Sequence, residues 1–182
     1  MSYTELSRRK FIQLTSAGII TSALMPSQAL ASLASRPRTI TLNNLHTGEK
    51  LETCYFDGAR YVSAELARVN HICRDFRRNE SHPMDRALLD KINAIQSVLG
   101  TQAEVQIISG YRSPATNEML RGKSSGVAKK SYHMLGQAID FRLAGVPLSD
   151  VRKAAISLKA GGVGYYPGSN FVHIDTGPAR AW

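Results

Sequence analysis

The sequence is poor in cysteine and lacks the features that mark several classes of protein. Its 182 residues contain two cysteines, Cys54 and Cys73, and neither has a neighbouring Cys or His at zinc-finger spacing, which excludes a zinc finger built on them. After the first 31 residues no apolar run approaches the length of a membrane span, so we expect no stable span in the mature chain. There is no internal repeat and no interleaving of basic and aromatic residues, so we expect no nucleic-acid partner.

The residues that are present have the composition of one globular domain. Hydrophobic residues make up 43% of the chain and charged residues 20%, a balance typical of folded domains rather than of disordered or fibrous chains. A chain of this length can bury a core without support from disulfides or metals.

The amino terminus has the three parts of an export signal. The segment SRRKFIQ, residues 7–13, contains the pair Arg8 and Arg9, a weakly apolar run rich in Ser, Thr and Gly follows, and this run ends in ALA. The order resembles a bacterial twin-arginine signal. We therefore expect recognition by the twin-arginine export machinery, cleavage after Ala31, and a mature domain over residues 32–182 in the periplasm. An amphipathic terminal helix and an uncleaved, anchoring leader are the alternatives.

Export has consequences for charge and for the cysteines. Removal of residues 1–31 takes away three basic residues and one acid, so the formal net charge falls from +9 to +7. This charge favours anionic partners, which in the periplasm are carboxylate-rich cell-wall peptides or the membrane surface. A disulfide can persist in that compartment, and the sequence leaves open whether Cys54 and Cys73 form one.

Hydrophobic periodicity predicts an α+β domain with a mainly antiparallel sheet and flanking helices. The clearest helix, at 84–100, has an apolar face and ends at Gly100. That face consists of Leu88, Leu89, Ile92, Ile95, Val98 and Leu99. Other helices are predicted over 60–76, around 117–120 and over 147–160 from a cap at Ser149, and strands in a hairpin over 39–56 and over 105–108, 136–143, 161–166 and 170–176.

Two histidines and an aspartate are candidate metal ligands. His133 ends a polar loop, Asp140 lies near the end of an apolar strand, and His173 lies on the last predicted strand, so all three can meet at one edge of a sheet. Catalytic zinc commonly takes three protein ligands from His, Asp and Glu and leaves the fourth position to water. A His and an Asp at this spacing are by themselves a weak signal, and a buried histidine is the plainer alternative.

The neighbouring residues strengthen this interpretation. The motifs SGYRSPATN at 109–117, SYHMLGQAID at 131–140 and FVHID at 171–175 together resemble the zinc peptidases of the D-alanyl-D-alanine metallopeptidase and hedgehog fold. The resemblance covers the chain from about residue 39 onward. It implies a hedgehog/DD-peptidase-like fold, zinc as cofactor, and His133, Asp140 and His173 as its ligands.

The same resemblance leaves the other catalytic residues less certain. It makes Arg112 the arginine of the strand-end motif, where it can bind a substrate carboxylate or stabilise an oxyanion; a surface arginine that caps a turn is the alternative. Related peptidases carry an acid three residues before the last ligand, and here that position is Asn170. Asp175 is the nearest acid, and we expect it to deprotonate the zinc-bound water or to orient a ligand histidine, unless it only caps a turn.

Other polar and aromatic residues allow two interpretations each. The four tyrosines near the motifs can line a peptide cleft or pack in the core; they are Tyr111, Tyr132, Tyr165 and Tyr166. The basic loop RGKSSGVAKKS, residues 121–131, is either solvated or placed over a substrate. Ser131 has no GxSxG motif around it, so a serine hydrolase is rejected.

The resemblance, with the leader, implies an exported zinc-dependent peptidase that hydrolyses peptide cross-links in peptidoglycan, including those between two diaminopimelate residues. We expect peptidoglycan stem peptides as its partners and a monomeric chain. Two alternatives remain open: a D,D- or L,D-carboxypeptidase that trims stem peptides with the same metal site, and a non-catalytic cell-wall-binding module of the same fold.

Overall fold

The computed structural model describes residues 36–124 and 126–182 of the chain. The predicted export signal at residues 1–31, with its cleavage position after Ala31, lies outside the described residues. None of the helices in the described part is both long and apolar enough to cross a membrane.

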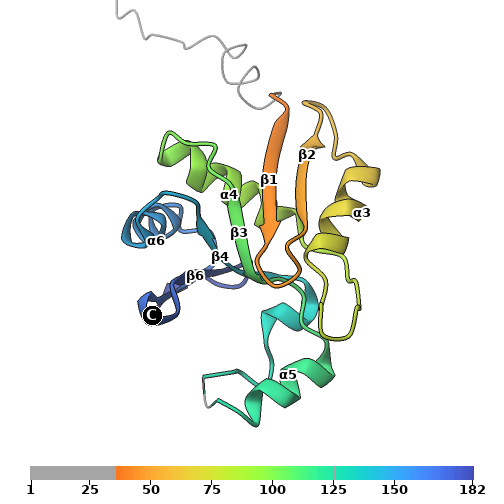
Figure 1. The fold of residues 1–182 in the computed structure, drawn as a ribbon. Helices are drawn as coiled ribbons and strands as arrows, with labels where there is room; N and C mark the ends of the chain where they lie inside the picture. Colours follow the sequence, from red (N-terminus) through yellow and green to blue (C-terminus); the bar gives the residue numbers. More distant parts are fainter. Residues whose placement is uncertain (1–35, 125) are drawn as a thin grey trace, which may run out of the picture. The chain divides into compact units, whose positions relative to one another are not determined.

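The described strands form one mixed sheet (Figure 1). Its strand order is β2-β1-β3-β4-β6-β5-β7. The strands are β1 (Arg38–Asn44), β2 (Lys50–Phe56), β3 (Val105–Ser109), β4 (Ala138–Leu143), β5 (Gly162–Tyr166), β6 (Phe171–Asp175) and β7 (Arg180–Ala181). The predicted hairpin over 39–56 is confirmed as β1 and β2, and the predicted later strands are confirmed as β3 to β6.

The sheet departs from the predicted, mainly antiparallel arrangement at two pairs of strands. The pairs β1–β2, β3–β4, β4–β6 and β5–β6 are antiparallel, but β1–β3 and β5–β7 are parallel. Parallel neighbours need a long crossover connection, and the chain supplies one between β1 and β3 through β2 and two helices. The α+β class is therefore confirmed, and the prediction of sheet direction is corrected to a mixed sheet.

Four α-helices and two 3-10 helices accompany the described strands. They are α3 (Ser63–Ile72), α4 (Arg86–Val98), α5 (Pro114–Arg121), η1 (Tyr132–Leu135), α6 (Leu148–Ser157) and η2 (Pro167–Ser169). Helix α3 contacts β1 and β2, whereas α6 contacts β4, β5, β6 and α4, and Figure 1 shows α5 beyond the end of β3, away from α4 and α6. The predicted cap at Ser149 is wrong, because α6 begins at Leu148 with the extended Pro147 before it.

Helix α4 supplies much of the apolar core. Leu88, Leu89, Ile92 and Ile95 are buried as the periodicity predicts, and each buried aliphatic side chain contributes about 1.5–3 kcal/mol to folding. Val98 differs, because it is the last helical residue and its side chain is 56% exposed. The core is thus formed by apolar residues of α3, α4, α6 and the sheet.

The two cysteines are not paired with each other. Cys54 lies on β2 and Cys73 follows α3, and both are free thiols. Cys73 is fully buried, and this burial raises the pKa of its thiol to about 12. A disulfide therefore plays no part in holding this domain together.

Candidate metal centre

His133 is placed by a short helix with a cap at each end. Ser131 precedes η1, and its hydroxyl oxygen accepts a hydrogen bond from the backbone N–H of His133 at 3.4 Å. Gly136 ends η1 with φ of +65°, a left-handed conformation that favours glycine. Gly136 therefore makes a sharp turn between the His133 loop and the strand that carries Asp140, and the hydrogen bond gives Ser131 a structural role.

Gly136 also leaves no space for a side chain. A Cβ atom built there would lie 2.1 Å from the carbonyl oxygen of Pro83, so a Gly136→Ala variant has both backbone strain and a clash. We expect it to lower the free energy of unfolding by at least about 2 kcal/mol. Gly145→Ala is the matched control, because Gly145 has φ of +73° but nothing within 4 Å of its Cβ position. Denaturant unfolding of both variants checks this, and equal losses would contradict the role of the Pro83 contact.

Strand register brings Asp140 and His173 together. They are direct partners on the antiparallel strands β4 and β6, and Ser109 at the end of β3 is the partner of Asp140 on its other side. Opposite residues of an antiparallel pair project from the same face of the sheet. The backbone N–H of Arg112 donates to the carbonyl of His133 at 3.2 Å, which ties the loop after β3 to η1 beside these strands.

The three predicted ligands form one cluster. His133 Nε2 lies 3.3 Å from His173 Nδ1 and 3.3 Å from Asp140 Oδ2, and His173 Nδ1 lies 2.8 Å from Asp140 Oδ1. One ligand atom from each residue lies within 4.8 Å of the other two. Tetrahedral zinc with bonds of about 2.0–2.1 Å has ligand atoms about 3.3 Å apart. The donor set and its spacing therefore fit a zinc ion.

The outer nitrogen of each histidine is held by an acceptor. His133 Nδ1 lies 2.8 Å from the carbonyl oxygen of Gly110, and His173 Nε2 lies 3.2 Å from Asp175 Oδ2. A carbonyl only accepts, so Nδ1 of His133 carries a hydrogen, and Nε2 is the ring nitrogen that faces the cluster. Such contacts orient metal-binding histidines in known sites. Both rings thus present the correct nitrogen to the same point.

The cluster is electrostatically coupled. Burial alone would raise the pKa of the Asp140 carboxyl, but the charges and hydrogen bonds of His133 and His173 outweigh burial and hold that pKa well below its usual range. Burial opposes the charged form of His173, yet Asp140 and Asp175 raise the pKa of its ring to about 9. A metal ion at the cluster needs the lone pair of Nδ1, so its binding to His173 would release any proton held on that nitrogen.

Asp175 lies behind His173 and does not border the cleft. Its side chain has no exposed surface. Oδ1 accepts from the backbone N–H groups of Gly162 and Gly177 at 3.0 and 2.9 Å, and Arg180 donates to both carboxylate oxygens at 3.1 and 2.5 Å. Burial would raise the pKa of this carboxyl, but His173, Arg180 and the two N–H groups together lower it. The carboxylate is thus charged and fully occupied by donors.

Arg112 is partly buried at the cluster but loosely held. Its guanidinium makes contacts of 3.3 Å to Ser109 Oγ, 3.4 Å to Asn117 Oδ1 and 3.6 Å to Asp140 Oδ2, and its Nε has no hydrogen-bond partner. Desolvation lowers the pKa of this guanidinium, while Asp140 opposes that change. Arg112 therefore has hydrogen-bond donors that can bind a further group at the cluster. This arrangement does not fit the alternative interpretation, a surface arginine that caps a turn.

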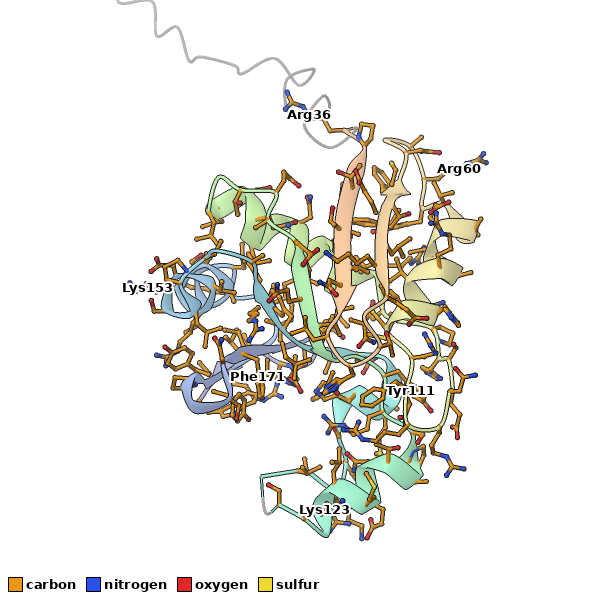
Figure 2. All side chains as sticks on the ribbon, in the orientation of Figure 1. Arg36, Arg60, Tyr111, Lys123, Lys153 and Phe171 are labelled. Atoms are coloured by element: carbon orange, nitrogen blue, oxygen red, sulfur yellow. The ribbon has the colours of Figure 1, made fainter. Side chains whose placement is uncertain are left out.

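A cleft of about 380 Å³ opens over the cluster. One border is the basic loop after α5, with Ser124, Lys130 and residues between them, and the other is aromatic. The aromatic border consists of Tyr132, Tyr166, Phe171 and Trp182. In Figure 2, Phe171 lies at the start of β6 and Lys123 lies in the segment beyond α5, next to the loop residues that border the cleft. The basic loop was interpreted as either solvated or placed over a substrate. The structure places part of it beside the cluster, which favours the second interpretation.

Two of the four tyrosines border the cleft and two do not. Tyr132 and Tyr166 are cleft residues, whereas Tyr111 stacks on the ring of His82 and Tyr165 lies under the guanidinium of Arg152. Cleft lining therefore describes Tyr132 and Tyr166, and packing against neighbouring side chains describes Tyr111 and Tyr165.

Asn170, at the position where related peptidases carry an acid, does not border the cleft. It follows η2 with φ of +54°, a left-handed conformation that Asn tolerates, and it borders a separate depression with Gln106 and Arg142. Sequence reasoning missed Arg180 and Trp182, which border the cleft beside His173. The only signal for them was their place in the ending FVHIDTGPARAW.

Comparison with known proteins identifies the family. A family model described as "Peptidoglycan L,D-endopeptidase MepK" matches residues 32–182. Curated proteins of that name from Escherichia coli strain K12 and from Shigella flexneri are 53% identical to this chain over the full length of both. A Haemophilus influenzae protein named "Probable peptidoglycan L,D-endopeptidase MepK" is 45% identical over all of this chain and 98% of its own. The sequence resembles the metallopeptidase superfamily and, within it, murein endopeptidase K. This resemblance is confirmed: the chain belongs to the MepK family of peptidoglycan L,D-endopeptidases.

Proposed function

We propose that this chain is a zinc-dependent endopeptidase, exported through the twin-arginine route to the periplasm, that hydrolyses peptide cross-links in peptidoglycan, including those between two diaminopimelate residues. The observation that carries the proposal is the largely buried cluster of His133, Asp140 and His173, which borders a cleft. The names of the relatives support the substrate, and the α+β sheet with its three motifs supports a hedgehog/DD-peptidase-like fold.

His133, Asp140 and His173 would hold the zinc ion through Nε2, a carboxylate oxygen and Nδ1. When bound, zinc supplies a polarised scissile carbonyl and a water molecule whose pKa is lowered to about 7. The protein contributes the orientation of the two rings, because the Gly110 carbonyl and the Asp175 carboxylate each hold the outer nitrogen. The cleft, which all three residues border, would bind the peptide.

Asp175 orients His173 in this proposal and is not the general base. Its carboxylate is fully buried, is occupied by Arg180 and two backbone N–H groups, and contacts the side of the His173 ring opposite Asp140. A proton acceptor must reach the reacting water, and Asp175 has no surface on the cleft. Among the described residues that border the cleft, Asp140 is the only acid, so we assign no separate carboxylate base.

Arg112 binds the anionic group of the substrate or the oxyanion that forms when the carbonyl is attacked. Its donor atoms are 3.3 Å or more from their present partners and one of them has none. An oxyanion or carboxylate would complete these hydrogen bonds, and charge-assisted bonds of this kind are stronger than neutral ones.

Digestion of purified sacculi tests the proposed function. We expect the mature domain, residues 32–182, to release products with about one zinc ion per chain, to lose this activity after treatment with a chelator, and to regain it when zinc is restored. Mass spectrometry of the muropeptides then identifies the bond. Loss of cross-linked dimers indicates an endopeptidase, whereas loss of a single terminal residue would indicate a carboxypeptidase. Zinc-loaded protein that binds sacculi and releases nothing would overturn the proposal in favour of a wall-binding module.

A further inference from the structure

The last residue of the chain, Trp182, is fixed at the edge of the sheet. Its backbone N–H donates to the carbonyl of Val163 at 3.1 Å, and its carbonyl accepts from the N–H of Tyr165 at 3.1 Å. These bonds continue the parallel pairing of β7 with β5. The carboxyl terminus is therefore bound to the strand that neighbours β6, which carries His173.

Neighbouring residues hold the indole of Trp182 in a defined position. Its Nε1 donates to the hydroxyl of Tyr166 at 2.8 Å, and the guanidinium of Arg180 lies 5.1 Å from the ring centroid. Gly164 makes the space, because a Cβ atom there would lie 2.9 Å from the indole. A hydrogen bond, a cation–π contact and a missing side chain thus hold one ring in one position.

Trp182 as a whole residue is nevertheless 48% exposed. Its ring centroid lies 5.5 Å from that of His173, and it borders the cleft. Among the large hydrophobic residues that are exposed in the described part of the chain, Trp182 is the one that borders the cleft. A tryptophan buries about 150–250 Å² in a core or an interface, so the exposed surface of this residue is available to a ligand in the cleft.

We infer that Trp182 is a substrate-positioning residue and that its indole face contacts the aliphatic part of the peptide that is cleaved at the cluster. This inference rests on the proposed function. The aromatic border of the cleft continues through Tyr166 and Phe171, whose rings stack at 4.6 Å. The other border presents Lys130, with Arg112 at the base. A side chain with methylene groups and a terminal carboxylate matches both borders, since its methylenes can cover the rings while its carboxylate meets a cation.

Kinetics of Trp182→Ala, Trp182→Phe and Val98→Ala test this role, with any affinity tag at the amino terminus. We expect Trp182→Ala to raise KM for a cross-linked muropeptide about ten-fold, with kcat changed less than about three-fold and one zinc ion still bound. Trp182→Phe keeps a ring and should recover most of this loss. Val98→Ala removes an equally exposed apolar side chain at the end of α4 and should match the wild type. Unchanged KM in Trp182→Ala, or loss of zinc with kcat, would overturn the inference.

Fluorescence gives a second readout, because Trp182 is the single tryptophan of the chain. We expect the emission of wild-type protein, stripped of zinc so that nothing is cleaved, to change saturably as the muropeptide is added, and the Trp182→Phe protein to show no such change. If zinc-loaded wild type cleaves sacculi but its zinc-free emission and the KM of Trp182→Ala are both unchanged, the role of Trp182 alone is overturned. If zinc-loaded wild type cleaves nothing, the proposed function itself is overturned.

Discussion

His133→Ala is expected to lose zinc and cross-link cleavage together. The variant would leave Asp140 and His173 as the remaining ligands of the cluster, and two protein ligands do not make a catalytic zinc site. Because the metal contributes several kcal/mol of transition-state stabilisation, we expect cleavage of sacculi to fall at least about a thousand-fold. Metal analysis and a muropeptide digest of the same preparation measure both quantities.

His71→Ala is the matched control for this variant. His71 lies near the end of α3 with an exposed side chain, and its nearest charged partner is Glu49 at 3.9 Å. We expect wild-type zinc content and cleavage from it. Cleavage retained by His133→Ala would show that the cluster is not the reaction centre, whereas loss of zinc from both variants would point to a general defect in folding.

Asp175→Asn is expected to weaken zinc binding about ten- to a hundred-fold. The amide oxygen can replace Oδ1 and still accept from Gly162 and Gly177, but an NH₂ group then replaces Oδ2, which accepts from His173 and Arg180. The NH₂ group would then face two other donors, the Nε2–H of His173 and the guanidinium of Arg180. The His173 ring therefore loses the acceptor that orients it. Zinc titration and the kinetics of the zinc-saturated variant separate this effect from catalysis.

The two roles once open to Asp175 predict different results. If Asp175 is a positioning residue, Asp175→Asn lowers zinc affinity, and saturating zinc restores much of kcat. If Asp175 were the general base, the variant would lower kcat while zinc affinity stays at the wild-type value. The second pattern would contradict our assignment. Asp175→Ala is expected to be more severe and to lower the free energy of unfolding by about 3 kcal/mol, because it leaves Arg180, the buried N–H of Gly162 and the part-buried N–H of Gly177 without their acceptor.

Local patterns predicted most of the secondary structure and failed where local signals were weak. The helix at 84–100 and the hairpin at 39–56 were found because apolar residues recur with the period of the element that they form. The antiparallel pairs agree with the prediction, but the parallel pairing of β1 with β3 was not predicted, since it depends on how the intervening helices return the chain. Strand β7 has two residues and no periodicity, so nothing in its own sequence marks it as a strand.

The sequence by itself determined the candidate ligands and the family, because a metal site needs particular donor types and the motifs around His133, Asp140 and His173 record them in order. Only the tertiary structure decided what Asp175, Arg180 and Trp182 do. Their roles depend on contacts between β5, β6 and β7 and with η1, whose spacing along the chain carries no local signal. Burial placed the Asp175 carboxylate behind a histidine, and pairing at the sheet edge placed the last residue of the chain beside the cluster.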